Sequence, residues 1–156
     1  MIYWQCKSFS ELTAEEIYKI LQLRNEIFVV EQNCVYQDCD NKDQEAFHLM
    51  ARENHILIAY SRLLRPGLSY SDAASIGRIC VSAASRRKNS GKLLMRKSIE
   101  ETYRLFGNID IKISAQLYLK RFYESFFFVP LGDVYLEDGI EHIQMRKKFQ
   151  GVINAI

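Results

Sequence analysis

A basic, glycine-containing turn lies between a predicted strand and a predicted helix. It reads Arg86-Arg87-Lys88-Asn89-Ser90-Gly91-Lys92 and is followed by Leu93. The start of a helix presents backbone N–H groups without internal partners and the positive end of the helix dipole, so an anion is favoured there. The four basic side chains add positive charge at the same place. The sequence therefore predicts that residues 86–92 bind a phosphate-bearing cofactor.

Two familiar phosphate-binding patterns do not fit this turn. The P-loop needs Gly-x4-Gly-Lys-Ser/Thr, because its hydroxyl reaches a magnesium ion. Here Arg86 stands in place of the first glycine, and Leu93 stands in place of the hydroxyl residue. The dinucleotide pattern Gly-x-Gly-x-x-Gly is also absent. The turn therefore does not belong to a P-loop NTPase, and nothing indicates a dinucleotide-binding fold.

Charge is unevenly distributed along the chain, although the net charge is only +2. Residues 26–45 contain six acids and one lysine, whereas residues 86–97 contain six bases and no acid. Two patches of opposite sign indicate a site that meets an anionic ligand on one side and a cationic ligand on the other. Two solvated faces remain the alternative. Nucleic acid is not an expected partner, because no aromatic residue is interleaved in residues 86–97 for base stacking.

Metal-binding patterns are incomplete, and we expect no metal site. Asp38-x-Asp40 begins like a calcium loop, but Asp43 replaces the required glycine and Leu49 replaces the final glutamate. Three further candidate ligands have no standard zinc spacing and lack a fourth member: Cys34, Cys39 and His48.

The cysteines and the apolar segments indicate a cytoplasmic protein. The four cysteines are irregularly spaced in a chain large enough to need no disulfides, so free thiols are expected. No apolar run approaches the roughly 20 residues that span a bilayer. Residues 1–5 lack the basic segment of a signal peptide. A membrane partner is therefore not expected.

Hydrophobic periodicity and turn residues predict a mixed α/β chain that forms one domain over residues 1–156. Thr13 and Glu16 form a capping-box pattern that starts a helix, and residues 31–45 read as a loop. The remaining helices are predicted at 90–106 and 118–126. Strands are predicted at 2–7, 47–53, 55–64, 75–82, 109–115, 127–136 and 140–149. The strand–helix–strand segment from Ser75 to Ala115 predicts a parallel pair with a right-handed crossover.

Arg24 lies on the apolar stripe of the first helix and needs a partner there. The stripe contains Ile17, Ile20, Leu21 and Phe28. A guanidinium among apolar side chains is costly unless it is paired. We expect Arg24 to bridge to Glu31 or another acid and so fix the acidic loop, with direct contact to a substrate as the alternative.

The turn at 86–92 resembles the signature of the GNAT N-acetyltransferase superfamily, Gln/Arg-x-x-Gly-x-Gly/Ala. It matches at Arg86-x-x-Asn89-x-Gly91, where Asn89 replaces the first glycine. Asparagine tolerates a positive φ, so the turn should survive. Most of the chain also resembles the bacterial ElaA-type branch of this superfamily. The matching segments are residues 21–24, 28–40, 48–49, 76–82, 115–116, 122–126 and 135–145.

The resemblance implies a mixed, mostly antiparallel sheet of the α/β (α+β) type, with a central splayed parallel pair and flanking helices. Acetyl-CoA would be the co-substrate, with its pantetheine arm along the backbone of one central strand. The implied cofactor-binding residues are Ile79, Cys80, Val81, Arg86, Arg87, Lys88, Asn89, Ser90, Gly91, Lys92 and Gln116. The implied reaction moves an acetyl or short acyl group to a small amine or a protein amine. The alternative is a domain that binds acyl-CoA without transfer.

Within this resemblance, Tyr123 is the expected acid that protonates the departing thiolate, since an ordinary phenol stays protonated at neutral pH. Four residues are candidates for the base that accepts the amine proton: Glu31, Asp38, His48 and His142. Of these, Glu31 and His48 are expected to be catalytic, together with Tyr123. The expected substrate-binding residues are Arg24, Asp38, Asp40 and His142. Phe127-Phe128 departs from the usual Gly-Phe, which puts the local turn in question. Exposed edge strands make a homodimer a further possibility.

Overall fold

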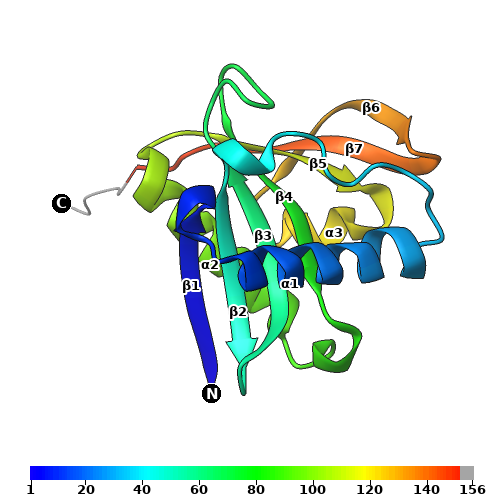
Figure 1. The fold of residues 1–156 in the computed structure, drawn as a ribbon. Helices are drawn as coiled ribbons and strands as arrows, with labels where there is room; N and C mark the ends of the chain where they lie inside the picture. The colour runs from blue at the N-terminus through cyan, green and yellow to red at the C-terminus, as the bar shows by residue number, and fades with distance from the viewer. Residues whose placement is uncertain (152–156) are drawn as a thin grey trace.

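A computed structural model describes residues 1–151, and the last five residues of the expected domain lie outside it. Seven strands form one sheet in the order β1-β2-β3-β4-β5-β7-β6 (Figure 1). The strands are β1 (Ile2–Ser8), β2 (Phe47–Glu53), β3 (Ile56–Leu64), β4 (Ala74–Val81), β5 (Ile111–Gln116), β6 (Val129–Glu137) and β7 (Ile140–Lys147). The helices are α1 (Ala14–Arg24), α2 (Ser90–Phe106) and α3 (Lys120–Glu124). The short helical turns are η1 (Phe9–Glu11), η2 (Asn25–Glu31), η3 (Asp43–Glu45), η4 (Ala83–Ser85) and η5 (Leu117–Leu119).

The predicted elements are present with small shifts at their ends. Thr13 accepts a hydrogen bond from the Glu16 N–H at 3.1 Å, and the Glu16 carboxylate accepts one from the Thr13 N–H at 2.9 Å. This capping box starts α1 where the sequence predicted it. The helix predicted at 118–126 is shorter, because it divides into the 3₁₀ turn η5 and the single α-helical turn of α3.

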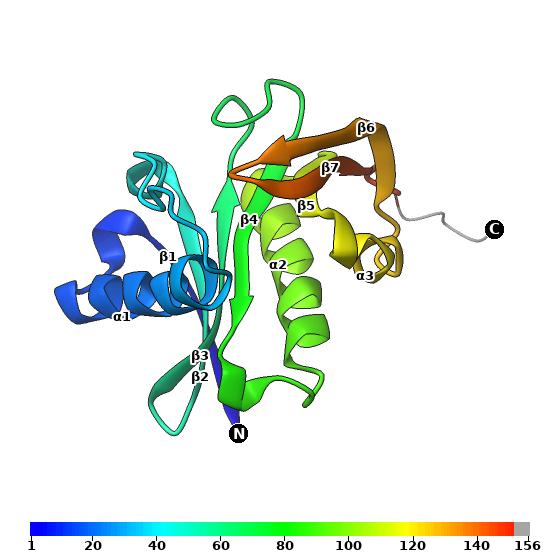
Figure 2. The same cartoon turned by 90° about the vertical axis from the view of Figure 1, so that its right-hand side faces the viewer.

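Helices cover both faces of the central strands. Helix α1 lies across one face of β2, β3 and β4, and α2 lies against the other (Figures 1 and 2). Ile20, Leu23 and Ile27 pack against Met50 and Tyr60 on the α1 face. On the α2 side, a larger apolar cluster joins α2 and α3 to β3, β4, β5 and β7. Among the described helices, none is long and apolar enough to cross a membrane.

The parallel pair β4–β5 separates soon after it forms. Its ladder consists of Ala74 opposite Ile111 and Ser75 opposite Lys112. The other strand pairs are antiparallel. Arg78 has a φ of 50°, and the β3–β4 register shifts at this point, so β4 bends locally. The expected mixed sheet with a central splayed parallel pair is therefore confirmed (Figure 2).

A widened helical segment follows α1 and was not predicted. η2 is a π-helix, in which the N–H of Gln32 bonds the carbonyl of Ile27 at 3.3 Å. The next such bond joins the N–H of Cys34 to the carbonyl of Val29 at 3.1 Å. This segment extends the first helix to Glu31, where the loop begins.

Phe127 adopts a backbone conformation that normally belongs to glycine. It follows α3 with a φ of 69°, its N–H bonds the Glu124 carbonyl, and the Phe128 N–H bonds the Tyr123 carbonyl. These bonds form a Schellman ending, in which glycine is the usual left-handed residue. The departure from Gly-Phe therefore leaves the turn intact. Its ring is exposed, while Phe128 is buried.

We expect Phe127→Gly to be more stable than Phe127→Ala by about 1 kcal/mol, because a left-handed L-residue costs roughly that much. Both variants lose the same contact with Lys147, whose Nζ lies 5.2 Å from the Phe127 ring centroid. The measurement is the free energy of unfolding in urea. An alanine variant as stable as the glycine variant would show that this backbone is not strained.

Candidate functional site

A cleft of about 930 Å³ opens where β4 and β5 separate. Its walls come from η2, β4, β5, α3 and the β6–β7 hairpin, so segments far apart in sequence meet there. Most of the predicted site residues line it. Of the predicted catalytic residues, Glu31 and Tyr123 lie in its wall and His48 does not.

The basic turn reaches this cleft with its backbone donors available. Asn89 caps α2 with a φ of 59° and makes no side-chain capping bond. Arg87 is also left-handed, with a φ of 66°. Left-handed residues of this kind turn successive N–H groups toward one side, which creates an anion-binding concavity. A Cβ built on Gly91 would have only Phe122 nearby, at 3.9 Å. The first turn of α2 is therefore open to a phosphate.

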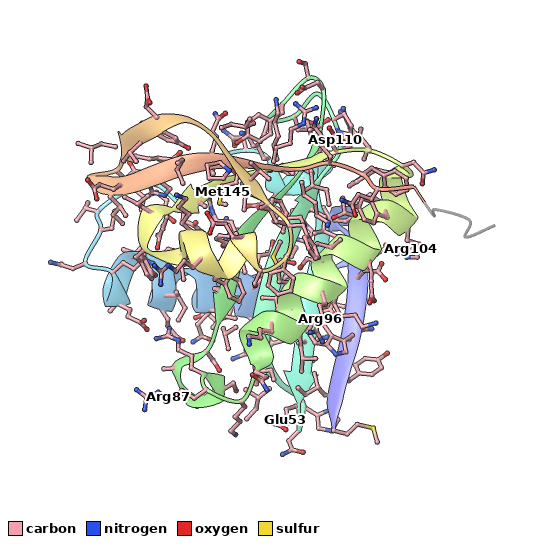
Figure 3. All side chains as sticks on the ribbon, turned by 180° about the vertical axis from the view of Figure 1, so that it is seen from behind. Glu53, Arg87, Arg96, Arg104, Asp110 and Met145 are labelled. Carbon is pink, nitrogen blue, oxygen red and sulfur yellow. The ribbon has the colours of Figure 1, made fainter. Side chains whose placement is uncertain are left out.

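Basic side chains lie at this turn and along the helix that follows it, and of these Arg86 and Arg87 line the cleft. Arg87 projects from the turn at its outer end, and Arg96 lies further along α2 (Figure 3). Lys88 and Lys92 are exposed as well. Exposed cations beside uncapped N–H groups suit a multiply charged anion such as a diphosphate.

Arg86 points across the cleft and binds Glu31. Its guanidinium donates to both carboxylate oxygens of Glu31, at 2.5 and 2.9 Å. The hydrogen bond and charge of Arg86 lower the pKa of Glu31. A carboxylate with a lowered pKa and a bidentate partner is a weak base. The geometry therefore disfavours Glu31 as the residue that accepts the amine proton.

The strand backbone predicted to bind pantetheine lies in the same wall. Ile79, Cys80 and Val81 line the cleft beyond the last β4–β5 ladder pair. The Val81 carbonyl accepts a hydrogen bond from Arg86 Nε at 3.3 Å. Burial raises the pKa of the Cys80 thiol to about 12, so this cysteine is not a ready nucleophile.

Tyr123 enters the cleft from α3. Its side chain is almost completely buried, and within residues 1–151 its hydroxyl has no hydrogen-bond partner. Burial, and then the neighbouring Tyr118, raise the pKa of the phenol above its ordinary value. The phenol therefore keeps its proton across the neutral range. It can donate a hydrogen bond to a group that arrives in the cleft.

His48 does not face the cleft, and its assignment as a catalytic base is corrected. It is 1% exposed, and both ring nitrogens are occupied. Nδ1 bonds the Tyr60 hydroxyl at 2.8 Å, and Nε2 bonds the Asp43 carbonyl at 2.9 Å. Burial lowers the pKa of His48, which favours the neutral ring. Its role is to support the acidic loop from within the core.

Arg24 is paired with acids of the loop, as expected, but not with Glu31. The side chain is fully buried. Nε donates to Asp38 at 2.7 Å, and Nη1 donates to Asp43 at 2.8 Å. Direct contact between Arg24 and a substrate is therefore excluded, and its substrate-binding assignment is corrected to a structural one.

The carboxylates of the loop are neutralised by two further arginines. Arg62 donates to both oxygens of Asp40, at 2.7 and 2.8 Å, and Arg78 donates to Asp38 at 2.7 Å. Burial alone would raise the pKa of Asp40, but the hydrogen bond and charge of Arg62 outweigh it and hold the pKa well below its ordinary value. The expectation that Asp38 and Asp40 attract a cationic amine is corrected, since three arginines already balance this cluster.

Two glutamines connect the walls of the cleft. The Gln116 amide of β5 donates to Gln32 at 3.1 Å, and the Gln32 amide donates back at 3.3 Å. Nearby, the Cys34 thiol lies 3.3 Å from the Asp138 carbonyl. Gln116, predicted to bind the cofactor, therefore also holds the segment after η2 against β5, and Cys34 holds it against the β6–β7 hairpin.

His142 lines the cleft, and within residues 1–151 only one of its ring nitrogens is hydrogen bonded. Nδ1 bonds the Ile140 carbonyl at 2.7 Å, and Nε2 lies 3.4 Å from the Glu137 carboxylate. Glu137 also accepts a hydrogen bond from Ser114 at 3.2 Å. Tyr135 stacks on the imidazole, with ring centroids 6.0 Å apart.

Sequence reasoning missed several of these residues. Arg62 interrupts the apolar run of β3, which is the same signal that identified Arg24, so its need for an acid was detectable. The proximity of Glu137 to His142 follows from the hairpin register, in which Tyr135 pairs with His142 and Glu137 with Ile140. Among the described residues, no group of three or more His, Cys, Asp or Glu could hold a metal ion.

Comparison with known proteins agrees with this architecture. Residues 10–149 match a family model described as an acetyltransferase (GNAT) domain. Protein ElaA of Escherichia coli is 41% identical over 150 residues, which cover 95% of this chain and 97% of ElaA. A UPF0039 protein of Synechocystis is 40% identical over 145 residues, which cover 92% of this chain and 94% of that protein.

Two solved structures share the fold throughout. An acyl-CoA N-acyltransferase from Pseudomonas aeruginosa has a TM-score of 0.90 and 41% identity, covering 94% of this chain and 99% of that one. Escherichia coli ElaA has a TM-score of 0.88 and 40% identity, covering 95% and 100%. The chain therefore belongs to the GNAT acetyltransferase family and is a GNAT-type N-acetyltransferase of the ElaA-type branch.

Proposed function

We propose that this protein transfers an acetyl or another short acyl group from acyl-CoA to a primary amine by direct attack. The observation that carries the proposal is the gap between β4 and β5, which leads to the uncapped first turn of α2. A strand edge without a ladder partner can bond an extended arm as an additional strand would. The diphosphate of coenzyme A would then lie on the amides of residues 86–92.

Tyr123 has the position and protonation that this reaction needs. Tyr123 lines the cleft, its hydroxyl has no hydrogen-bond partner within residues 1–151 and is not a fully buried atom, and its raised pKa keeps the proton on the oxygen. The residue would donate that proton, or a hydrogen bond, to the sulfur as the thiolate leaves. Cys80 is not needed as an intermediate acyl carrier, because its thiol is buried and its pKa is raised.

The alternative of acyl-CoA binding without transfer was motivated by Asn89 and Phe127 at usual glycine positions. Both residues adopt the left-handed conformation that glycine would have there, with φ of 59° and 69°. These substitutions therefore give no structural reason for a loss of transfer.

A two-part experiment tests the proposal. Acetyl-CoA, longer acyl-CoAs and free CoA should each raise the melting temperature, since a ligand at 100 times its Kd stabilises the folded state by about 2.7 kcal/mol. Pantetheine without phosphates should raise it much less. Acetyl-CoA mixed with a panel of primary amines should then release free thiol. Stabilisation without thiol release for every amine would favour the non-catalytic alternative, and no stabilisation would overturn both.

A further inference from the structure

A polar cluster on β5, β6 and β7 faces away from α2 and α3. Ile113, Ala115 and Met145 point into the core on the α2 side, whereas Ser114 and His142 alternate with them and lie on the opposite face. The proposed diphosphate site begins α2, so the acyl arm would enter from the α2 side. The acceptor must then approach from the face that carries His142.

The protonation of His142 is defined by its neighbour. A carbonyl oxygen only accepts, so the bond from His142 to Ile140 at 2.7 Å requires a proton on Nδ1. A neutral ring therefore has its lone pair on Nε2. That nitrogen lies 3.4 Å from a carboxylate oxygen of Glu137. Two acceptors facing each other at this distance suit a hydrogen-bond donor or a cation between them.

Within residues 1–151, no lysine or arginine lies within ion-pair distance of Glu137, and Lys42 of the same cleft is hydrogen bonded to Ser69. From β6, the phenol of Tyr135 stacks on His142 and bonds Ser114 of β5. Tyr70 lines the cleft as well, and burial, followed by the charges of Tyr135 and Glu137, raises its pKa to about 12. Lys112 lies over the Tyr70 ring, but its ammonium is hydrogen bonded to Asp72.

The segment after η2 and the hairpin tip complete the surroundings. Gln32 brings no charge, and the Cys34 thiol is bonded to the Asp138 backbone rather than to its carboxylate. The other predicted bases are engaged elsewhere. Glu31 is bound by Arg86, and His48 is buried. Only His142, among the four, combines a place in the cleft with a free nitrogen lone pair.

The geometry points to an acceptor site at Glu137 and His142 that takes the ammonium of a primary amine. This inference rests on the proposed acyl transfer. The ammonium donates to the Glu137 carboxylate and to His142 Nε2, and one of its protons passes to Nε2. The neutral nitrogen forms a bond to the thioester carbonyl carbon, and the carbon–sulfur bond breaks with its electron pair on sulfur. The nitrogen then loses a second proton to solvent, sulfur gains the proton of Tyr123, and a proton from solvent restores the phenol, so the net release is the one proton held by His142.

The test compares two amines of similar size in four variants. Ethylamine is charged at neutral pH, whereas trifluoroethylamine is largely uncharged and needs no base to remove a proton before it attacks. His142→Asn keeps a donor for the Ile140 carbonyl but has no basic nitrogen. We expect it to lower kcat/KM for ethylamine about 100-fold, the usual scale of general-base catalysis, and to affect trifluoroethylamine little. The ethylamine defect should shrink as the pH rises and solvent supplies the free amine.

Glu137→Gln should raise the KM for ethylamine about 10-fold and leave the KM for trifluoroethylamine nearly unchanged. The matched controls are His55→Asn in the exposed β2–β3 turn and Glu141→Gln at the exposed start of β7, outside the cleft. Both should behave as the unmodified protein with either amine.

Binding of ethylamine to the complex with free CoA, measured by calorimetry, separates the two hypotheses. If the unmodified protein binds CoA but releases no thiol, the proposed function fails. The acceptor site would still be supported if Glu137→Gln loses ethylamine binding and the control Glu141→Gln keeps it. If thiol is released and His142→Asn shows equal losses for both amines, or none, the acceptor site is overturned and acyl transfer stands.

Discussion

Replacing Gly91 by leucine is expected to abolish coenzyme A binding and to leave the protein folded. In the structure a Cβ at this position would meet only Phe122, at 3.9 Å, so the unliganded helix has room for it. A larger side chain on the first turn of α2 would occupy the space that a phosphate needs to reach the amides. Two charge-assisted hydrogen bonds lost at about 1.5–3 kcal/mol each raise the Kd at least 100-fold.

Stability separates this effect from misfolding. Glycine in a helix costs up to about 1 kcal/mol relative to alanine, so Gly91→Ala and Gly91→Leu should melt at the same temperature as the unmodified protein or slightly higher. Calorimetry with free CoA gives the Kd. Glu100→Leu, which adds a leucine to the exposed side of the same helix two turns on, is the control and should bind CoA normally. An unchanged Kd in Gly91→Leu would refute the phosphate-binding turn.

The elements that local chemistry defines were predictable from the sequence. Helix α2 begins at Ser90 and ends at Phe106 as predicted, because a left-handed Asn89 starts it and Gly107, with a φ of 80°, ends it. The capping box at Thr13 is equally local. The π-helix was not predictable in this way. Its widened turn depends on tertiary packing around Ile27, and no residue pattern in that segment distinguishes it from ordinary helix.

The partners of buried charges could not be derived from local patterns. Arg24 was recognised as a charge that needs an acid, but six acids follow it before residue 46. Only the folded chain shows that Asp38 and Asp43 are its partners. His48 illustrates a related limit. The alternation of side chains along β2 assigns His48 to one face of the sheet. Because α1 and α2 cover both faces, this assignment could not show whether His48 lies in the core or in the cleft.

The corrected assignments change the electrostatics of the proposed acceptor side. Asp38 and Asp40 were expected to attract the amine, yet their charge is balanced by arginines. Glu31 is likewise bound by Arg86. Among the described residues that line the cleft, Glu137 and Asp138 are the acids without an arginine partner, and the carboxylate of Glu137 lies beside His142. We therefore expect the carboxylate of Glu137 in the β6–β7 hairpin, rather than those of Asp38 and Asp40 in the loop, to attract a cationic amine.

Tyr123→Phe is expected to lower the turnover number about 100-fold without weakening cofactor binding. The expected size is that of removing one acid from a transition state. Within residues 1–151 the Tyr123 hydroxyl has no hydrogen-bond partner, so its removal leaves no unpaired group and the fold should be unaffected. Because burial raises the pKa of this phenol, the rate should not decline through loss of its proton below about pH 10, the ordinary pKa of tyrosine.

The measurement is thiol release at saturating acetyl-CoA and amine, together with the Kd for CoA by calorimetry. Tyr18→Phe is the matched control, because Tyr18 is exposed on α1 and lies outside the cleft. A loss confined to kcat in Tyr123→Phe, with an unchanged Kd, assigns the hydroxyl to the departing sulfur. Equal losses in Kd and kcat would instead make it a binding group. Unchanged turnover would remove Tyr123 from the mechanism.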